Sequence, residues 1–417
     1  MIRGLKELED LDRADVLREF REEFELPSGV IYLDGNSLGA LSKRARERIA
    51  RVVDLEWGRD LITSWNGADW ISMPQRTGDK IAALIGAGKG EVVAADSTTV
   101  NLFKVLSVAL RANPGRRVIV SEVSNFPTDL YVIEGVIAQL GGIHDLVLVE
   151  GTEEVLDAVL SQRGPEIAAV VLTHVHYTTS RVYDMRRVTS AAHQAGALIV
   201  WDLSHSAGVF PLELNGCDAD FAVGCGYKHL NGGPGAPAFI YAARRFHDRF
   251  EQPISGWMGD ARPFDFHAGY EPAQGITRYL SGTPSVIAMA ALEASVEVIL
   301  EAPMDAIRRK SIALGDLFID LVDRHCEGLG LELVSPRDGA RRGSHVSYRH
   351  AASYAVMQAL IQQSVIGDCR PPDLLRFGFA PLYLRYVDIW NAVMRIAEIL
   401  RTRAWDRPEF RSRQLVT

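Results

Sequence analysis

One lysine stands between two groups of glycines near the middle of the chain. The stretch is GCGYKHLNGGPG, residues 224–235, and the apolar run before it, residues 219–223, predicts a buried strand. The GxGxxG fingerprint of dinucleotide-binding proteins is excluded because His229 takes the place of its last glycine. A P-loop is excluded as well, because Tyr227 precedes the lysine and no serine or threonine follows it.

Lys228 has the surroundings that a Schiff-base lysine needs. Small neighbours let the backbone approach a flat ring, and partial burial lowers the pKa of the amine below its ordinary value of about 10.4. The alternative is an ordinary loop lysine above a tight turn. Lys228 alone does not decide between the two.

A carboxylate upstream favours pyridoxal phosphate chemistry. Asp202 ends the apolar run ALIVWD, and His205 follows it in WDLSH. A pyridoxal phosphate site needs an anion against the pyridinium nitrogen, because the protonated ring is the electron sink. Open α/β sheets present such groups at the carboxyl ends of their strands. The alternative for Asp202 is to cap the next helix.

The other parts of such a site also have candidates. In AADSTTVNLFKVL, Ser97, Thr98 and Thr99 open a helix and offer hydroxyls and backbone N–H groups to a phosphate, although the same residues suit a simple capping box. Phe126 follows the strand RRVIVSE and could stack on the ring, with Asp129 three residues later. Together these residues predict a pyridoxal phosphate pocket.

An α/β fold would bring these residues to one edge of a sheet. From about residue 90 to 290, apolar runs alternate with helical stretches, which predicts a mostly parallel sheet buried on both faces. The runs are VVAAD, RRVIVSE, IAAVVLTHV, ALIVWD, DFAVGC and APAFIYA. Long helices begin near Ser285, followed by strands such as SHVSYRH and a helix near 387–402, which predicts a smaller α+β domain.

We therefore expect three parts in the chain. Residues 1–45 form an N-terminal segment that packs on the small domain and at the active-site entrance. It contains IYLDGNSLGAL, residues 31–41, a short strand that breaks into a turn, and a basic helix follows from Ser42. Residues 46–290 form the cofactor-binding large domain, and residues 291–417 form the small C-terminal domain.

Composition limits the partners. The 417 residues are 47% hydrophobic and 24% charged, ordinary for a globular protein. The net charge of -8 provides no basic face for nucleic acid. The sequence has no apolar run of about 18 residues and no signal peptide, so we expect no membrane partner and a cytoplasmic location. Four cysteines without a CxxC pair indicate a reducing compartment.

Taken in chain order, the motifs resemble one family. They are IYLDGNSLG, DSTTVNL, SNFPTD, LTHVHYTTS, WDLSHSAG, GCGYKHLNGGPG, GWMG, YLSGTP and DCRPPDLLRFGFAPLYLRY. From about Ile31 to Tyr386 the chain resembles the kynureninase family, within the fold-type-I pyridoxal phosphate enzymes of the class V aminotransferase group. The combination is specific, although several motifs are weak alone.

The resemblance implies a role for each candidate. Lys228 would bind pyridoxal phosphate as a Schiff base and, once released, act as the base at the substrate Cα. Asp202, with Asp129 nearby, would hold the pyridinium side, and Phe126 would stack on the ring. The remaining candidates would bind the phosphate or line the pocket: Thr98, Thr99, Tyr227, Thr173 and His205. We also expect Tyr227, acidified by phosphate and nearby charge, to carry protons in later steps.

The resemblance also implies a homodimer whose active sites are completed by both subunits. Trp257 and Thr283 would reach the phosphate of the other subunit. Arg376 would grip the substrate carboxylate by a bidentate pair, for which arginine is suited. Trp65, Asn36 and Ser37 would lie near the aryl group: Trp65 in ITSWNG, the other two in DGNSLG.

The implied reaction is the hydrolysis of L-kynurenine to anthranilate and L-alanine by Cβ–Cγ cleavage, in tryptophan catabolism. Kynurenine is favoured over 3-hydroxykynurenine because the indole of Trp65 offers a 3-hydroxyl no hydrogen-bonding carboxylate or amide. Cysteine desulfurase is an alternative on the same fold, with Cys369 as its nucleophile.

Two further alternatives have less support. His174 and His176 form an HxH pair that suggests a metal-dependent hydrolase, but the sequence has no convincing set of further ligands, and we expect no metal. A non-catalytic binding protein on this fold would be expected to have lost Lys228 or Asp202, and both are present.

Overall fold

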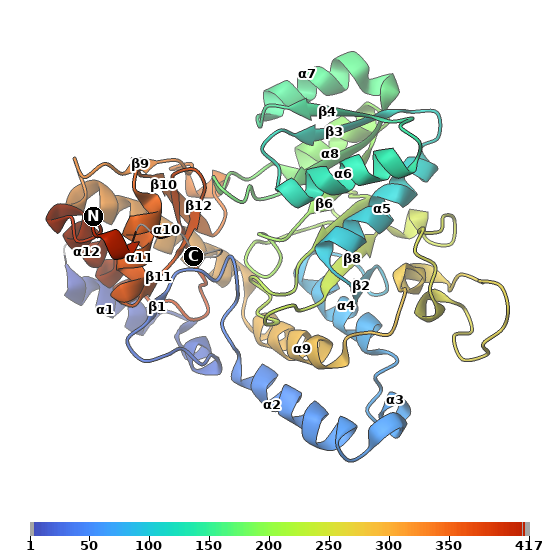
Figure 1. Ribbon diagram of the computed structural model, residues 1–417, viewed down its shortest axis with the longest axis horizontal. Helices are drawn as coiled ribbons and strands as arrows, with labels where there is room; N and C mark the ends of the chain where they lie inside the picture. The colour runs from blue at the N-terminus through green and yellow to red at the C-terminus, as the bar shows by residue number, and fades with distance from the viewer. Residues whose placement is uncertain (1–3, 411, 413–417) are drawn as a thin grey trace.

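A seven-stranded sheet forms the centre of the larger part of the molecule (Figure 1). The computed structural model describes residues 4–410 and residue 412. Six of its strands run in the same direction, and β8 is antiparallel to both of its neighbours, β2 and β7. In spatial order the strands are β2 (Val92–Ala95), β8 (Ala238–Ala242), β7 (Phe221–Gly224), β6 (Leu198–Asp202), β5 (Ile167–Thr173), β3 (Val118–Glu122) and β4 (Asp145–Val149).

Helices cover both faces of this sheet. All seven residues of β5 are buried, as the continuous apolar run IAAVVLT requires for a strand with helices on either side. The mostly parallel sheet expected from the sequence is confirmed. The helices of this part are α4 (Met73–Leu84), α5 (Thr98–Ala112), α6 (Pro127–Gln139), α7 (Glu153–Arg163), α8 (Met185–Gln194) and α9 (Val286–Glu301).

The second part is a smaller α+β unit. Its antiparallel sheet has the order β12 (Asp368–Arg370), β13 (Leu374–Gly378), β10 (His345–Arg349) and β9 (Glu332–Leu333). The long helices α10 (Met304–His325) and α12 (Tyr386–Thr402) pack on each other, and α11 (Ser353–Gln362) packs on α12. In Figure 1 this unit lies beside the large sheet.

The N-terminal segment joins this small unit rather than the adjacent large sheet. Helix α1 (Leu5–Ala14) packs on α12, and β1 (Ile31–Tyr32) pairs in parallel with β11 (Val365–Ile366). Helix α2 (Lys43–Arg51), capped by Ser42, then packs on α9, and the short α3 (Ser64–Gly67) follows.

Helix α9 belongs to the larger part, so the boundary between the two parts lies after the expected residue 290. It packs on α2 and α4, and its residues from Met289 to Ile299 are almost all buried. Helix α10 instead packs on α12, so the chain leaves the large part near Pro303. In the described part of the chain, no helix is both long and apolar enough to span a bilayer.

Close helix-to-strand packing gives a stability test. A Cβ on Gly78, inside α4, would overlap the backbone of β2 at Val92, whereas one on Gly135, inside α6, would meet nothing within 4 Å. We expect Gly78→Ala to lower the free energy of unfolding by about 3 kcal/mol. The matched Gly135→Ala should raise it by about 0.5 kcal/mol. Denaturant unfolding would contradict this packing if the two variants had equal midpoints.

Candidate active site

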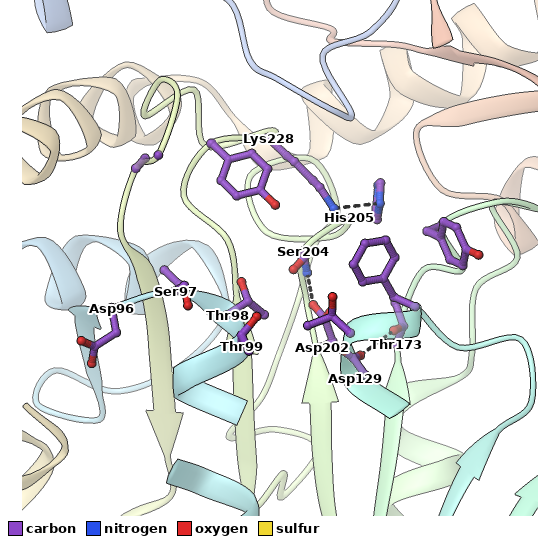
Figure 2. A pocket seen from close by; sticks show the side chains of 17 residues that line it. Asp96, Ser97, Thr98, Thr99, Asp129, Thr173, Asp202, Ser204, His205 and Lys228 are labelled. Carbon is purple, nitrogen blue, oxygen red and sulfur yellow. Dashed lines mark hydrogen bonds between the residues drawn. The ribbon is translucent and has the colours of Figure 1, made fainter. Parts of the chain in front are cut away.

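A cavity of about 250 Å³ opens where β5 and β6 end and α5 and α6 begin (Figure 2). This is the edge at which α/β sheets bind their ligands. Ten of the residues that sequence analysis selected line it: Ser97, Thr98, Thr99, Phe126, Asp129, Thr173, Asp202, His205, Tyr227 and Lys228. The structure thus brings the expected cofactor residues into one place.

The lysine sits on a tightly folded loop after β7. A Cβ on Gly226 would overlap the carbonyl oxygen of Pro237, and the N–H of Gly232 donates to the Gly226 carbonyl at 2.9 Å. The amine of Lys228 lies 3.1 Å from Nε2 of His205 and 5.7 Å from the ring centre of Phe126. Within the described residues, no carboxylate forms an ion pair with this amine.

Two buried carboxyl groups face the same cavity from neighbouring elements. Asp202, at the end of β6, accepts a hydrogen bond from the N–H of Ser204 at 2.6 Å. Asp129 lies in the first turn of α6, and the Thr173 hydroxyl is 3.4 Å from it. Burial, followed by the charge of Asp202, raises the pKa of Asp129 well above its usual value. Two such acids are stable side by side only when they share a proton or when a cation lies between them.

The start of α5 forms an anion site on the opposite wall. Ser97 is the N-cap, and Thr98 and Thr99 are the first two residues of this 15-residue helix. Figure 2 shows all three side chains beside the cavity. Asp96 precedes them with a left-handed backbone, φ 44°, and the buried Lys104 neutralises it at 2.6 Å. Free N–H groups and hydroxyls at a helix start suit a phosphate.

Phe126 supplies an exposed ring at the cavity. Its side chain is 38% exposed, and its ring meets Tyr177 edge to face at 5.1 Å. A lysine, a carboxyl pair, an anion site and an exposed aromatic face around one cavity match the aldehyde, ring nitrogen, phosphate and ring face of pyridoxal phosphate. The residues present fit this cofactor.

Arg376 lies outside the cavity wall and is already engaged. It is 2% exposed on β13, and its Nε and Nη2 both bond the carboxylate of Asp368 on β12. Nη2 also donates to Ser37 Oγ at 2.7 Å, and Nη1 donates to the carbonyl of Tyr177 at 2.7 Å. The bidentate face of the guanidinium is therefore held by Asp368. A substrate carboxylate would meet the remaining Nη1 proton or would have to displace this partner.

A second acid and a second arginine surround this pair. Arg370 lies 2.7 Å from Asp368, and Asp34 precedes Ser37 in the N-terminal loop. Burial and then the charge of Asp368 raise the pKa of Asp34 to about 7. Burial alone would also raise the pKa of Asp368, but Arg376 and Arg370 outweigh it and hold that pKa low.

The N-terminal loop lies directly against the lysine loop. The N–H of Gly39 donates to the carbonyl of Tyr227 at 2.7 Å, and a Cβ on Gly39 would overlap the carbonyl oxygen of Lys228. Asn36 is fully buried and packs on Gly378, because a Cβ at position 378 would overlap its side chain. Asn36 and Ser37 therefore lie behind the cavity, not among the residues that line it.

Trp65, Trp257 and Thr283 also lie away from the cavity of their own chain. The rings of Trp65 and Trp257 are 6.5 Å apart, and Trp257 stacks near Phe266. Thr283 lines a neighbouring cavity of about 260 Å³, which shares Asp96 and Gly235 with the first. A single chain does not bring these three residues to Lys228.

The protein's own groups do not acidify Tyr227, and the expected effect of the phosphate stays a prediction. Burial, followed by Cys225 and Asp202, raises the pKa of the phenol. Burial and the charge of Asp202 favour the protonated form, so Tyr227 is a neutral hydroxyl at the cavity wall.

The residues behind the alternative functions have structural partners. His174 Nδ1 is 2.8 Å from Ser206 Oγ, and His176 Nε2 is 2.8 Å from the carbonyl of Ser124. In the ranges that the structure describes, no group of three or more suitable side chains could hold a metal ion. Cys369 lies in β12, paired with Leu375 of β13, rather than on a loop that could swing as a desulfurase nucleophile must.

Sequence reasoning missed several residues around the site. Tyr177 lines the cavity, while Asp368 and Asp34 form the acid part of the arginine cluster. Asp368 could have been suspected, because DCR places an acid beside one arginine and eight residues before Arg376. Nothing in the sequence indicates that Tyr177 faces the cavity.

Comparisons with known proteins find relatives over almost the whole chain. The family model described as the kynureninase C-terminal domain matches residues 307–396. A kynureninase from Burkholderia pseudomallei (strain 1106a) is 51% identical over 411 residues, 98% of this chain and 98% of its own length. A kynureninase from Pseudomonas fluorescens is 48% identical over the same shares of both chains.

Solved structures share the fold. The apo cysteine desulfurase from Thermococcus onnurineus NA1 has a TM-score of 0.77 at 20% identity, over 92% of this chain and 98% of its own. A C-DES mutant with glycine covalently linked to its PLP cofactor has a TM-score of 0.78 at 16% identity, over 91% and 99%. These likenesses confirm the fold-type-I expectation and, at such identities, show the fold alone.

The raised pKa of Asp34 predicts a pH dependence of stability. A carboxyl with a pKa near 4 unfolded and about 7 folded binds its proton more tightly in the folded state. Proton binding to Asp34 therefore contributes its full amount to the free energy of unfolding below about pH 4, and this contribution is lost as pH rises through about 7. Relative to wild type, Asp34→Asn should therefore gain up to about 3 kcal/mol in unfolding free energy from pH 5 to pH 8.

Denaturant unfolding at both pH values measures this difference. Asp305→Asn, at an exposed position at the start of α10, is the control and should follow wild type. The assignment fails if Asp34→Asn and Asp305→Asn show the same pH dependence.

Proposed function

The chain belongs to the kynureninase family, and on this premise we propose that it hydrolyses L-kynurenine to anthranilate and L-alanine, with pyridoxal phosphate as its cofactor. The observation that carries the proposal is the joint position of Lys228, the carboxyl pair and the start of α5 around one cavity. The family supplies the substrate, and the cavity supplies groups that can hold the cofactor.

The chain's own groups would divide the cofactor between them. Lys228 would hold its aldehyde carbon, Asp202 and Asp129 its ring nitrogen, and Thr98 and Thr99 its phosphate. When bound, pyridoxal phosphate supplies an electron sink for the carbanions that form at the substrate Cα and Cβ. Asp202 keeps the ring nitrogen protonated, which that role requires.

Lys228 is the proposed base at the substrate Cα. Its amine points toward His205, 3.1 Å away, which can accept a hydrogen bond when the amine carries the extra proton (Figure 2). Tyr227 is the proposed proton carrier for the later steps. As a neutral phenol, Tyr227 would donate a proton to the substrate rather than remove one from it.

The bond changes balance with one water. Water adds to the γ-carbonyl carbon, and the Cβ–Cγ bond then breaks. The carbonyl carbon becomes the carboxyl group of anthranilate, and Cβ takes a proton to become the methyl group of alanine. Arg376 would hold the substrate carboxylate at the edge of the cavity, once Asp368 yields part of the guanidinium.

For the aryl group we propose unsubstituted kynurenine over its 3-hydroxy form. Trp65, the residue expected near the aryl group, packs its ring against Trp70 and Trp257 and has no acceptor to offer a hydroxyl. Like Trp257, it would have to reach the cavity of the partner chain. We assign the reaction to tryptophan catabolism, because kynurenine carries the carbon skeleton of a cleaved indole ring. None of the four cysteines forms a disulfide, which supports a reducing, cytoplasmic setting.

We also propose a homodimer in which each cavity is completed by the partner chain. Trp257 and Thr283 do not line the cavity of their own chain. Large apolar side chains are exposed near them and along residues 53–62, which is unusual for a surface that faces only water. They include Trp57 at 59%, Leu61 at 60%, Ile62 at 75%, Phe264 at 50% and Phe266 at 80% exposure.

The activity test follows anthranilate fluorescence after L-kynurenine is added to cofactor-loaded protein. We expect steady anthranilate release, a higher kcat/KM for L-kynurenine than for 3-hydroxykynurenine, and a loss of at least about 1000-fold in Lys228→Ala. Cys369→Ala serves as the control and should keep full activity.

Two outcomes would overturn parts of this proposal. A clear preference for 3-hydroxykynurenine would reverse the substrate assignment. Release of sulfide from cysteine, without anthranilate from either kynurenine, would replace the reaction by that of a desulfurase.

The shared site predicts complementation between two defective chains. A heterodimer of Lys228→Ala and Trp257→Ala chains has one cavity with both defects and one with neither. Isolated through two different tags, it should regain about half of wild-type activity, although each homodimer is poor. Activity no greater than the mean of the two homodimers would show that each cavity is built from one chain.

A further inference from the structure

A histidine from the small domain lies behind the histidine that contacts Lys228. His205 follows β6 in the large domain, and His345 is the first residue of β10 in the small sheet. Their ring centres are 5.5 Å apart. An N–H···N contact of about 3 Å puts two imidazole centres about 5 Å apart, so these rings can meet directly or through one water.

The contact with Lys228 fixes what His205 needs on its other side. A lysine amine that holds its extra proton can only donate, so Nε2 of His205, 3.1 Å away, is the acceptor. The ring proton of neutral His205 is then on Nδ1. That nitrogen is buried and has no partner within the described residues.

His345 has the complementary requirement. Its side chain is fully buried, and neither ring nitrogen has a hydrogen-bond partner in the described part of the chain. Leaving a buried polar atom unpaired costs about 1 to 3 kcal/mol, so such atoms in folded proteins are normally paired or solvated by ordered water. Two buried histidines, each lacking a partner and adjacent to the other, can satisfy one another.

Burial, helped by nearby positive charges, keeps both imidazoles of this pair neutral. Burial lowers the pKa of His205 and His345 well below the usual value, and Lys228 and Arg376 add to it. His229, beside Lys228, has a pKa lowered to about 3, and burial also lowers the pKa of His176, beyond β5. Asp368 faces Arg376 rather than the rings. The two imidazoles can therefore orient and pass protons without holding a charge at neutral pH.

We propose that His345 is a positioning residue for Lys228 and acts through His205. A nitrogen of His345 accepts the Nδ1–H of His205, directly or through one water. This holds the Nε2 lone pair toward the amine and makes it a better acceptor. The protonated amine is stabilised, and proton removal from the substrate Cα becomes easier. This inference rests on the proposed function, in which Lys228 is the base.

The register of the small sheet gives this contact a second consequence. His345 pairs with Gly378, and Ser347, two residues on, pairs with Arg376. The strand that carries the proposed carboxylate contact is thus hydrogen-bonded to the strand that carries His345. The paired strands β10 and β13 of the small domain would thus act on the substrate carboxylate through Arg376 and on its Cα through His345.

The test compares three variants of the cofactor-loaded protein. His345→Phe keeps a flat ring of similar size but has no acceptor, and His345→Gln restores one. His325→Phe is the matched control, because His325 belongs to the same domain but packs on Trp390 far from the cavity. Circular dichroism and thermal unfolding check that each variant is folded.

The first readout needs no turnover. The visible absorbance of the loaded protein is titrated with pH, and its midpoint reports the proton affinity at the Lys228 nitrogen. We expect the midpoint of His345→Phe to fall by about one unit, while His345→Gln and His325→Phe stay within a few tenths of wild type. A His345→Phe midpoint equal to that of wild type, in folded protein, would overturn the proposal.

The second readout separates positioning from general damage. With L-kynurenine, His345→Phe should lose about tenfold in kcat with little change in KM, and its isotope effect with Cα-deuterated substrate should increase. Equal losses in His345→Phe and His345→Gln would overturn the proposal. If wild type releases no anthranilate, the proposed function fails, but the absorbance titration still decides the role of His345.

Discussion

The loop that carries Lys228 is held by backbone contacts so close that two positions against it, Gly226 and Gly39, can have no side chain. Gly226 faces the carbonyl of Pro237, and Gly39 faces the carbonyl of Lys228 itself. Gly226 and Gly39 are therefore required by packing of the protein on itself as much as by the approach of a cofactor. Because Gly39 belongs to the N-terminal segment, this constraint also fixes where Ser37 and Asp34 meet Arg376.

Charge is distributed unevenly around the cavity, and the distribution follows from the elements that carry it. The carboxyl groups of Asp202 and Asp129 lie at the carboxyl end of a strand and the first turn of a helix, while Lys228 comes from the loop opposite. The positive end of α5 faces the same space. A ligand with a cationic ring and an anionic arm would satisfy both halves at once.

Much of this could be predicted from the sequence because it depends on local pattern. Continuous apolar runs predict six of the seven strands of the large sheet, and Asp202, Thr98 and Phe126 lie where strand ends and helix starts put them. The edge strand β4 was missed. What failed depends on distant parts of the chain. The pairing of Asp368 with Arg376 requires the register of β12 on β13. The pKa of Tyr227 rises because of burial that no local motif encodes. Helix α9 is apolar on most of its faces, so the sequence did not indicate which domain it joins.

The two-stranded pairing of β1 with β11 affects how the protein is made. It joins Ile31 to Val365, and Ser37 contacts Asp368 across 331 positions of sequence. Contacts of such separation form late, because the intervening chain must first be ordered. During synthesis the large sheet can fold as it leaves the ribosome, but the N-terminal segment has no partner until nearly the whole chain has been translated. A truncated product would keep most of the cavity around Lys228 and lack Arg376 and Asp368, so the ribosome has to finish the chain before the arginine cluster proposed for the substrate carboxylate can form.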